Sequence, residues 1–477
     1  MYELFFIFVT KRFVLKKWET NIIVFVIQSL IFMVQFNTIE EILEAADEHH
    51  IDFVKFQFSD TGGAFKELDV PLSLLGIALS KGVPFENSIV SSFKTVSVDL
   101  ILKPDIRTFS IISDGIGSVS FGRIICELMH SDGQTFDGCA RNALKLFVRK
   151  IFQAGYIFSV SASISFYLFS AETRKKALSP QNFTEQRDFT EPMDAETVAK
   201  MEKFKRDVLQ FLMSADIEIS SMFKNDQNGP FTVVLKESSV LRIADNIMTL
   251  KYIIQNAAQR YGLYASFMPK PLISTEGLTT SFGFVLMKNE FNEFYHPGKD
   301  MMISEKAHRF IGGIFSHIRG ICAVTNPTVN SYKRIAHKGK APYYISWSDA
   351  DRYSLIRLPS SRGRLTKIEI QNADSTCNPY LSLLVLLSSG IAGIENSTEV
   401  VYASNLESGN LSDDEKAALS AGTLPTTLSE AIEEFKKDDF LKHILGENIS
   451  ASLVQTLAKE WEDYSKHVHL WELEKYL

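Results

Sequence analysis

Cysteine is scarce in this chain of 477 residues, which contains only Cys126, Cys139, Cys322 and Cys377. These residues lie far apart, without a C-x-x-C pair and without zinc-like spacing to histidines, so we expect neither disulfides nor a thiolate metal site. Unpaired cysteines are typical of a reducing compartment. We therefore expect a cytoplasmic protein.

An excess of positive charge is also missing, because 50 basic side chains are opposed by 57 acidic ones, giving a net charge of −7. The sequence therefore predicts no general attraction for nucleic acid or anionic lipid. With 45% hydrophobic and 22% charged residues, the composition is that of a globular protein. A length of 477 residues favours two or three domains.

A long uninterrupted apolar run is absent, although residues 1–32 alternate between apolar, basic and apolar stretches. The run 22–36 contains polar residues and is shorter than the roughly 20 residues that cross a bilayer. A signal peptide or membrane anchor is one interpretation of this start. We favour the other, in which Met33 is the natural start and residues 1–32 are over-extended translation, so membrane association is not expected.

Local patterns predict a small α+β unit over residues 33–133, followed by long helices and single strands over 134–477. Thr38 or Asn37 is placed to cap a helix that begins at Ile39. Further helices are predicted at 71–81, 429–437 and 450–467, and strands at 53–58, 65–70, 96–102, 109–112 and 122–129. A capping-box pattern begins at Ser412, and the polar stretch 175–192 predicts a surface loop.

Several motifs closely resemble glutamine synthetase. For its catalytic domain these are the runs 267–271 (FMPKP), 326–334 (NPTVNSYKR) and 378–381 (NPYL). Residues 56–60 (FQFSD) and 471–477 (WELEKYL) are similar to its N-terminal domain and C-terminal end, so the resemblance covers about 38–477. It implies an α+β fold with an N-terminal β-grasp domain and a large catalytic domain around a curved antiparallel sheet. It also implies stacked six-membered rings with sites between adjacent subunits.

The family joins ammonia to glutamate through a γ-glutamyl phosphate, using ATP and two divalent cations, Mg²⁺ or Mn²⁺. Such cations need charged oxygen ligands. By resemblance, Glu369 is the only retained metal ligand, and the other ligand positions fall on Ser163, Ser165, Asn225, Thr232 and Ser281. We therefore expect metal binding to be weak or absent.

A shift in alignment does not restore the ligands, because the chain has no histidine between Ser131 and Tyr295 to supply the expected one. The nearby acids are Glu218, Glu237 and Glu276. The first two match polar positions outside the ligand set. Glu276 replaces an asparagine in the loop that holds glutamate, where it would repel the substrate's carboxylate.

The anion-binding positions are better preserved. The resemblance assigns substrate and phosphate binding to Arg334, Arg352, Arg357, Lys367 and Gly277, of which Lys367 replaces an arginine. Guanidinium groups bind carboxylates and phosphates in forked geometry. A further family arginine is Gln371 here, and the flap glutamate is Lys340. With fewer acids, this pocket favours a small anion such as glutamate, phosphate or a nucleotide.

By resemblance, Asp60 matches an acid that reaches the site from a neighbouring subunit and helps to deprotonate ammonium. Asp60 and Arg357 are therefore the catalytic candidates. The alternative for Asp60 is a carboxylate that caps the turn at Thr61, Gly62 and Gly63. For Glu369, the alternative to metal ligation is an ion pair with a nearby arginine.

Three functions follow. The one we favour is a catalytically silent relative that binds, scaffolds or regulates, as a homo-oligomer or in a mixed ring with a paralogue. The second is an active glutamine synthetase with compensating ligands. The third is a ligase that acts on another amine or acid with one metal or none.

Overall fold

The computed structural model describes residues 36–85, 100–112, 121–170, 174, 195–225, 229–272, 276–336, 343–349, 354–400 and 422–477. Residues 1–32, the predicted loop 175–192 and the capping box at Ser412 fall outside the described residues. In the part of the chain that is described, no helix is both long and apolar enough to cross a membrane.

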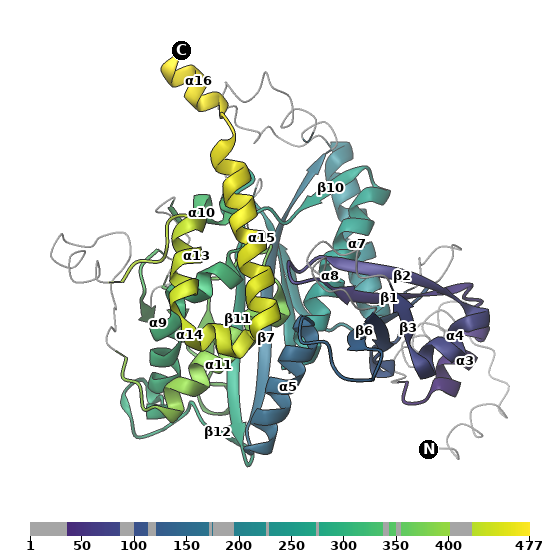
Figure 1. Ribbon diagram of the computed structural model, residues 1–477, viewed down its shortest axis with the longest axis horizontal. Helices are drawn as coiled ribbons and strands as arrows, with labels where there is room; N and C mark the ends of the chain where they lie inside the picture. Colours follow the sequence, from purple (N-terminus) through teal and green to yellow (C-terminus); the bar gives the residue numbers. More distant parts are fainter. Residues whose placement is uncertain are drawn as a thin grey trace, which may run out of the picture.

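The N-terminal part folds into a mixed sheet packed against two helices (Figure 1). Its strand order is β2-β1-β6-β4-β3, with β5 on β6; only the β1–β6 pairing is parallel. The strands are β1 Phe53–Ser59, β2 Phe65–Pro71, β3 Val83–Phe85, β4 Leu100–Pro104, β5 Ser110–Ile112 and β6 Phe121–His130, and the helices are α3 Ile39–Glu48 and α4 Leu72–Lys81. A mixed sheet packed against a helix is the β-grasp arrangement, so that prediction is confirmed.

The predicted helix start at Ile39 is confirmed. The Thr38 side chain accepts a hydrogen bond from the Glu41 backbone N–H, and the Glu41 side chain accepts from the Thr38 backbone, which completes a capping box. This orients α3 so that Ile42 and Ala46 enter the core of the N-terminal sheet.

The larger sheet is mostly antiparallel and curls through the centre of the molecule, as predicted (Figure 1). Its order is β13-β14-β15-β11-β7-β9-β8, with β10 on β7 and β12 on β11. The strands are β7 Ile157–Ser170, β8 Ile219–Lys224, β9 Phe231–Ser239, β10 Leu263–Ser266, β11 Thr280–Lys288, β12 Phe291–Asn292, β13 Trp347–Ser348, β14 Ile356–Arg357 and β15 Ile368–Ile370.

Helices cover the apolar face of this sheet and close the main core. They are α5 Ala140–Gln153, α7 Ala195–Ser214, α8 Val240–Arg260, α9 Glu305–Thr325 and α11 Pro379–Glu395. The remaining described α-helices of this part of the chain are α10 Val329–Ala336, α13 Leu428–Lys437, α14 Asp439–Leu445, α15 Glu447–Lys466 and α16 Leu470–Tyr476. The spacing of Val198, Met201, Phe204, Val208 and Phe211 predicts a core-facing stripe on α7; the last four are buried, but Val198 near the start of the helix is 47% exposed.

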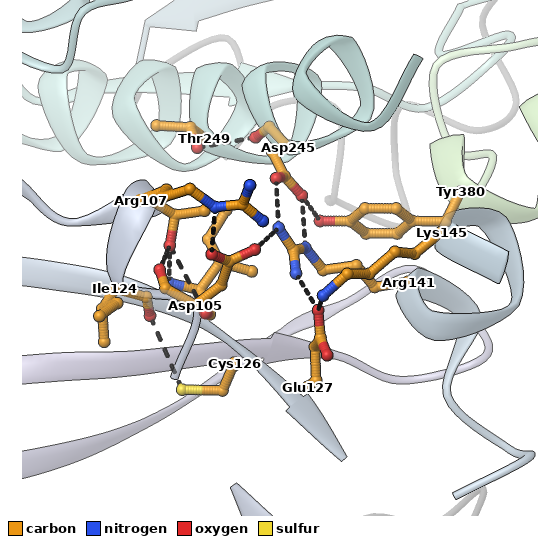
Figure 2. A network of polar contacts seen from close by, with 12 residues as sticks. Asp105, Arg107, Ile124, Cys126, Glu127, Arg141, Lys145, Asp245, Thr249 and Tyr380 are labelled. Atoms are coloured by element: carbon orange, nitrogen blue, oxygen red, sulfur yellow. Dashed lines mark hydrogen bonds and ion pairs between the residues drawn. The ribbon is translucent and has the colours of Figure 1, made fainter. Parts of the chain in front are cut away.

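A buried network of charged groups joins the two parts of the chain (Figure 2). Arg141 of α5 donates to both carboxylate oxygens of Asp245 on α8, at 2.9 and 2.8 Å, and to Glu127 of β6 at 2.9 Å. The Tyr380 hydroxyl donates to Asp245 at 2.7 Å, and Asp105 accepts from Arg141 at 3.1 Å. These contacts fix the N-terminal sheet against the helices that flank the larger sheet.

Candidate functional site

The predicted ligand positions on β7 share one face of the large sheet. Along this strand Val160, Ala162 and Ile164 point into the core, and successive side chains of a strand point to opposite faces. Ser161, Ser163 and Ser165 therefore line the other face.

Three of the expected metal positions form one hydrogen-bonded group across β7, β11 and β15. The hydroxyl oxygens of Ser163 and Ser281 are 2.7 Å apart, and the Ser281 hydroxyl donates to Glu369 at 3.2 Å. An ionised carboxylate can only accept, so Ser281 gives its proton to Glu369 and Ser163 gives its own to Ser281.

The other three positions form a second group across β7, β9 and the residue after β8. The Ser165 and Thr232 hydroxyls are 3.0 Å apart, and Thr232 donates to the side-chain oxygen of Asn225 at 3.3 Å. Ser165 and Thr232 are buried, whereas Asn225 is exposed. The structure thus brings all the predicted ligand positions together in two groups. Each group contains one residue of β7, Ser163 in the first and Ser165 in the second.

These groups do not suit a pair of divalent cations. Mg²⁺, Mn²⁺ and similar ions are held by several charged oxygens, but the two groups contain a single carboxylate, and their hydroxyls already donate hydrogen bonds to oxygens within each group. Among the described residues, no three histidine, cysteine, aspartate or glutamate side chains are grouped so that they could hold a metal ion. The assignment of these positions to metals rests on the resemblance.

The acids considered as substitutes do not join the two groups. Glu218 is exposed and pairs with Lys236, which lowers the pKa of that carboxyl, and Glu237 is also exposed on β9. Glu276 is half-buried, and its backbone oxygen accepts a hydrogen bond from the Tyr167 hydroxyl at 3.0 Å.

Arg357 lies beside the one retained carboxylate. Its Nη1 is 3.6 Å from Glu369, with side-chain exposures of 34% for the arginine and 20% for the glutamate. The buried Nε of Arg357 has no hydrogen-bond partner among the described residues. The structure therefore shows Glu369 in an ion pair, in line with the alternative given for it above.

Arg334 of α10 is buried within the protein scaffold. One Nη donates to Asn326 and to the Asn372 backbone oxygen, both at 2.8 Å, and the other donates to Thr279 at 3.4 Å. A side chain at Gly277 would place its Cβ 2.4 Å from Cγ of Arg334, so the loop needs glycine there. Burial lowers the pKa of Arg334. Arg334 and Gly277 thus hold the loop before β11 in place.

Lys367 and Gln371 flank Glu369 and are half-buried. Ile368 and Ile370 point into the core, so alternation along β15 puts Lys367, Glu369 and Gln371 on the face that carries the serines. Arg352 and Lys340 lie outside the described residues.

Asp60 lies at the end of β1, where its carboxylate accepts a hydrogen bond from the Ala64 backbone N–H at 2.9 Å. Asn378, the N-cap of α11, donates to the backbone oxygens of Asp60 and Thr61 at 3.1 and 3.2 Å. Burial raises the pKa of Asp60 even though several backbone hydrogen bonds oppose this. These contacts match the turn-capping alternative, and the catalytic role stays a prediction.

Sequence reasoning missed two residues of this sheet face, Ser161 and Gly283. They pair directly across β7 and β11. The alternation Ser161-x-Ser163-x-Ser165 is visible in the sequence and was the available signal for Ser161. Gly283 had no local signal, because its neighbours come from two other strands.

Comparison with known proteins identifies the family. Residues 137–476 match the family model of the glutamine synthetase catalytic domain. Glutamine synthetase of Methanosarcina mazei is 34% identical over 94% of this chain and 99% of its own, and that of Thermotoga maritima is 31% identical over 92% and 99%.

Solved structures share the fold. A GmaS–ADP complex superposes with a TM-score of 0.79 at 22% identity, covering 91% of this chain and 98% of its own. Plasmodium falciparum glutamine synthetase gives 0.78 at 20% identity, covering 93% and 99%. With a catalytic-domain match across most of its length and relatives above 30% identity, this chain belongs to the glutamine synthetase family.

Proposed function

We propose that this chain is a catalytically silent member of the glutamine synthetase family that acts as a binding, scaffold or regulatory subunit. The observation that carries the proposal is the pair of hydrogen-bonded groups, Ser163–Ser281–Glu369 and Ser165–Thr232–Asn225, at the metal-ligand positions. The family reaction needs divalent cations to neutralise the phosphates and to orient the carboxylate.

Replacing carboxylate ligands by neutral side chains removes a large electrostatic attraction for the cation. A carboxylate about 4 Å from a unit charge contributes on the order of 4 kcal/mol at an effective dielectric near 20, and a divalent ion doubles this value. A neutral hydroxyl replaces that attraction with a weak dipole. Glu369 alone remains, and Arg357 at 3.6 Å already offsets its charge. A divalent cation at this position would meet a positive neighbour and only one acid.

The replacement of carboxylates by neutral side chains also favours the binding of anions. Arg357 and Lys367 lie on this sheet face, where Glu369 pairs with Arg357. We propose that the pocket binds a small anion, either phosphate or the phosphate groups of a nucleotide, with weak or absent dependence on metal. Glutamate recognition is reduced because a family arginine is Gln371 and an asparagine is Glu276.

We further propose that the chain assembles as a cytoplasmic oligomer, either with itself or in a mixed ring with an active paralogue. Domain limits of 33–133 and 134–477 are part of this proposal. Light scattering of the purified protein measures the assembly, and a monomer at micromolar concentration would contradict it.

The decisive experiment measures amide and hydroxamate formation with ATP, glutamate and ammonia or hydroxylamine, in Mg²⁺ and in Mn²⁺. We expect no turnover above that of a heat-denatured sample. Turnover that disappears in Arg357→Ala would overturn the proposal, because it would require this site to be active.

A matched variant restores the family ligands together, through Ser163→Glu, Ser165→Glu, Asn225→Glu, Thr232→Glu and Ser281→His. We expect calorimetric titration to detect Mn²⁺ binding by this variant and not by the natural chain. Equal Mn²⁺ affinity for the two proteins would show that other ligands hold the metal.

A further inference from the structure

An apolar groove lies beside α5, apart from the two hydrogen-bonded groups. It has a volume of about 590 Å³ and is formed mainly by α5, the start of β7 and the start of α8. Its apolar side chains include Leu146, Val148, Phe152, Ile157 and Leu241. None of the described residues at the predicted metal-ligand or anion-binding positions lines it. The groove is therefore a surface separate from the site of the proposed function.

Large apolar side chains stand exposed along this groove. Phe152 at the end of α5 is 65% exposed, and Leu146 of α5 and Ile157 at the start of β7 are each 54% exposed. The core-facing side of α5 is made by other residues, among them Leu144 and Ile151, which are buried. Clustered exposed apolar side chains with a polar rim mark binding surfaces on soluble proteins. The three exposed side chains are thus available to a partner.

The rim of the groove is positively charged, although the chain as a whole carries a net charge of −7. Among the described residues that line it, Arg107, Lys145 and Arg149 are cations and Glu127 is the single acid. Glu127 accepts hydrogen bonds from Arg141 at 2.9 Å and from Lys145, so its charge is already engaged (Figure 2). Arg149 is exposed to solvent. This local excess of positive charge favours a partner that presents acids.

Cations also lie at the opposite end of the groove, just beyond the end of α5. Nζ of Lys288 is 4.5 Å from the centre of the Tyr156 ring, and Tyr156 lines the groove. Nζ of Lys306 is 5.6 Å from the same ring and also pairs with Glu293. Positive charge therefore flanks the apolar floor at both ends.

The concave shape and the charges match an amphipathic helix. A helix that docks in a groove places apolar residues at i, i+3, i+4 and i+7 into it and keeps its polar flanks at the rim. A small-molecule site buries most of its ligand, whereas side chains as exposed as Phe152 and Ile157 leave this groove open to solvent. A lipid surface is flat and would leave the hollow between these side chains unfilled.

We propose that the groove between α5, β7 and α8 binds an acidic amphipathic helix of a partner protein. The apolar face of that helix packs against Leu146, Phe152 and Ile157. Its aspartates or glutamates meet Arg107 and Arg149 at the rim. Apolar burial supplies most of the affinity, and the charges select an acidic helix over a basic one.

Fluorescence anisotropy of the full chain with labelled, stapled synthetic helices tests this surface. The acidic probe carries leucines at i, i+3, i+4 and i+7 and glutamates on both flanks, and the matched basic probe has lysines in place of the glutamates. We expect the acidic helix to bind about tenfold more tightly than the basic one, and its affinity to fall as salt screens the exposed rim charges. No binding of the acidic helix, or equal binding of both, would overturn the proposal.

Variants locate the binding surface. We expect Phe152→Ser to weaken binding of the acidic helix about tenfold, and Arg149→Glu to weaken it while improving binding of the basic helix. The control is Leu74→Ser on α4, which removes a leucine that is 54% exposed elsewhere on the surface. This control should leave the affinity unchanged. Equal affinity of Phe152→Ser and the natural chain, with both folded by circular dichroism, would refute the location.

Other occupants of the groove give different results. If a second copy of this chain covers it, Phe152→Ser lowers the particle mass measured by light scattering. If a lipid surface covers it, the natural chain binds phosphatidylglycerol vesicles and Phe152→Ser does not. Either result would overturn the proposal. Neither depends on turnover, so this inference and the proposed catalytic silence fail separately.

Discussion

At the scale of single residues, burial controls the chemistry of the thiols. Cys126, Cys139, Cys322 and Cys377 are all free and buried, which confirms the expectation of no disulfides. Burial raises the pKa of each thiol, in Cys322 to about 12. Because the thiolate is the reactive form, folded protein should resist thiol reagents.

We predict that a colourimetric thiol reagent at pH 8 detects fewer than one cysteine per folded chain and all four after denaturation in guanidinium chloride. Fast labelling of a thiol in the native protein would contradict the burial of that residue.

Asp60 gives a pH-dependent prediction. Because burial raises the pKa of Asp60, the folded chain binds that proton more tightly than the unfolded chain does. This group therefore makes stability fall as the pH rises from the ordinary carboxyl pKa through the raised value. An asparagine at this position keeps the oxygen that accepts from Ala64 and carries no charge.

We expect Asp60→Asn to raise the free energy of unfolding at pH 7 by up to about 1 kcal/mol. The gain should shrink as the pH is lowered toward 4, because the natural Asp60 becomes protonated. Urea denaturation across this pH range measures it. A variant that is less stable at pH 7 would indicate that the carboxylate form stabilises the turn.

At the scale of elements, the network around Arg141 joins α5, α8, α11 and β6 (Figure 2). Burial alone would lower the pKa of Arg141, but the carboxylates, above all that of Asp245, raise it well above its ordinary value. Removing one partner of such a buried pair leaves an uncompensated charge.

We predict that Arg141→Met lowers the free energy of unfolding by about 3–5 kcal/mol. The control is Arg107→Met, which removes an exposed arginine 3.3 Å from Asp105 and should cost less than about 1 kcal/mol. Denaturant unfolding of both variants provides the comparison. Equal losses would mean that the network contributes no more than a surface pair does.

At the scale of the whole molecule, the two hydrogen-bonded groups, Ser163–Ser281–Glu369 and Ser165–Thr232–Asn225, connect strands of the large sheet. A ligand that binds only the folded state at about 100 times its Kd stabilises it by about 2.7 kcal/mol. We predict that millimolar Mn²⁺ leaves the Tm of this protein unchanged relative to EDTA, and that it raises the Tm of the variant with restored ligands. A rise in the natural protein would reveal a metal site.

Much of the fold was predictable from the chain. Alternation and capping residues located α3, β1 and α4, and the family motifs predicted the β-grasp unit and the curved sheet. Local patterns succeed here because helix caps and strand alternation depend on residues a few positions apart. The grouping of the site was less accessible, because Ser165 and Thr232 are far apart in sequence and meet only through strand register.

The sequence by itself indicated the family and, by resemblance, placed Ser163, Ser165, Asn225, Thr232 and Ser281 at the positions of four carboxylate ligands and one histidine ligand, because residue identity at a motif position needs no coordinates. Only the tertiary structure decided that these residues hydrogen-bond to one another in two groups, and that Ser161 and Lys367 pack closely against Gly283. The physical reason is that pairing between β7, β9, β11 and β15 sets which side chains meet, and a shift of one residue would turn each side chain to the other face.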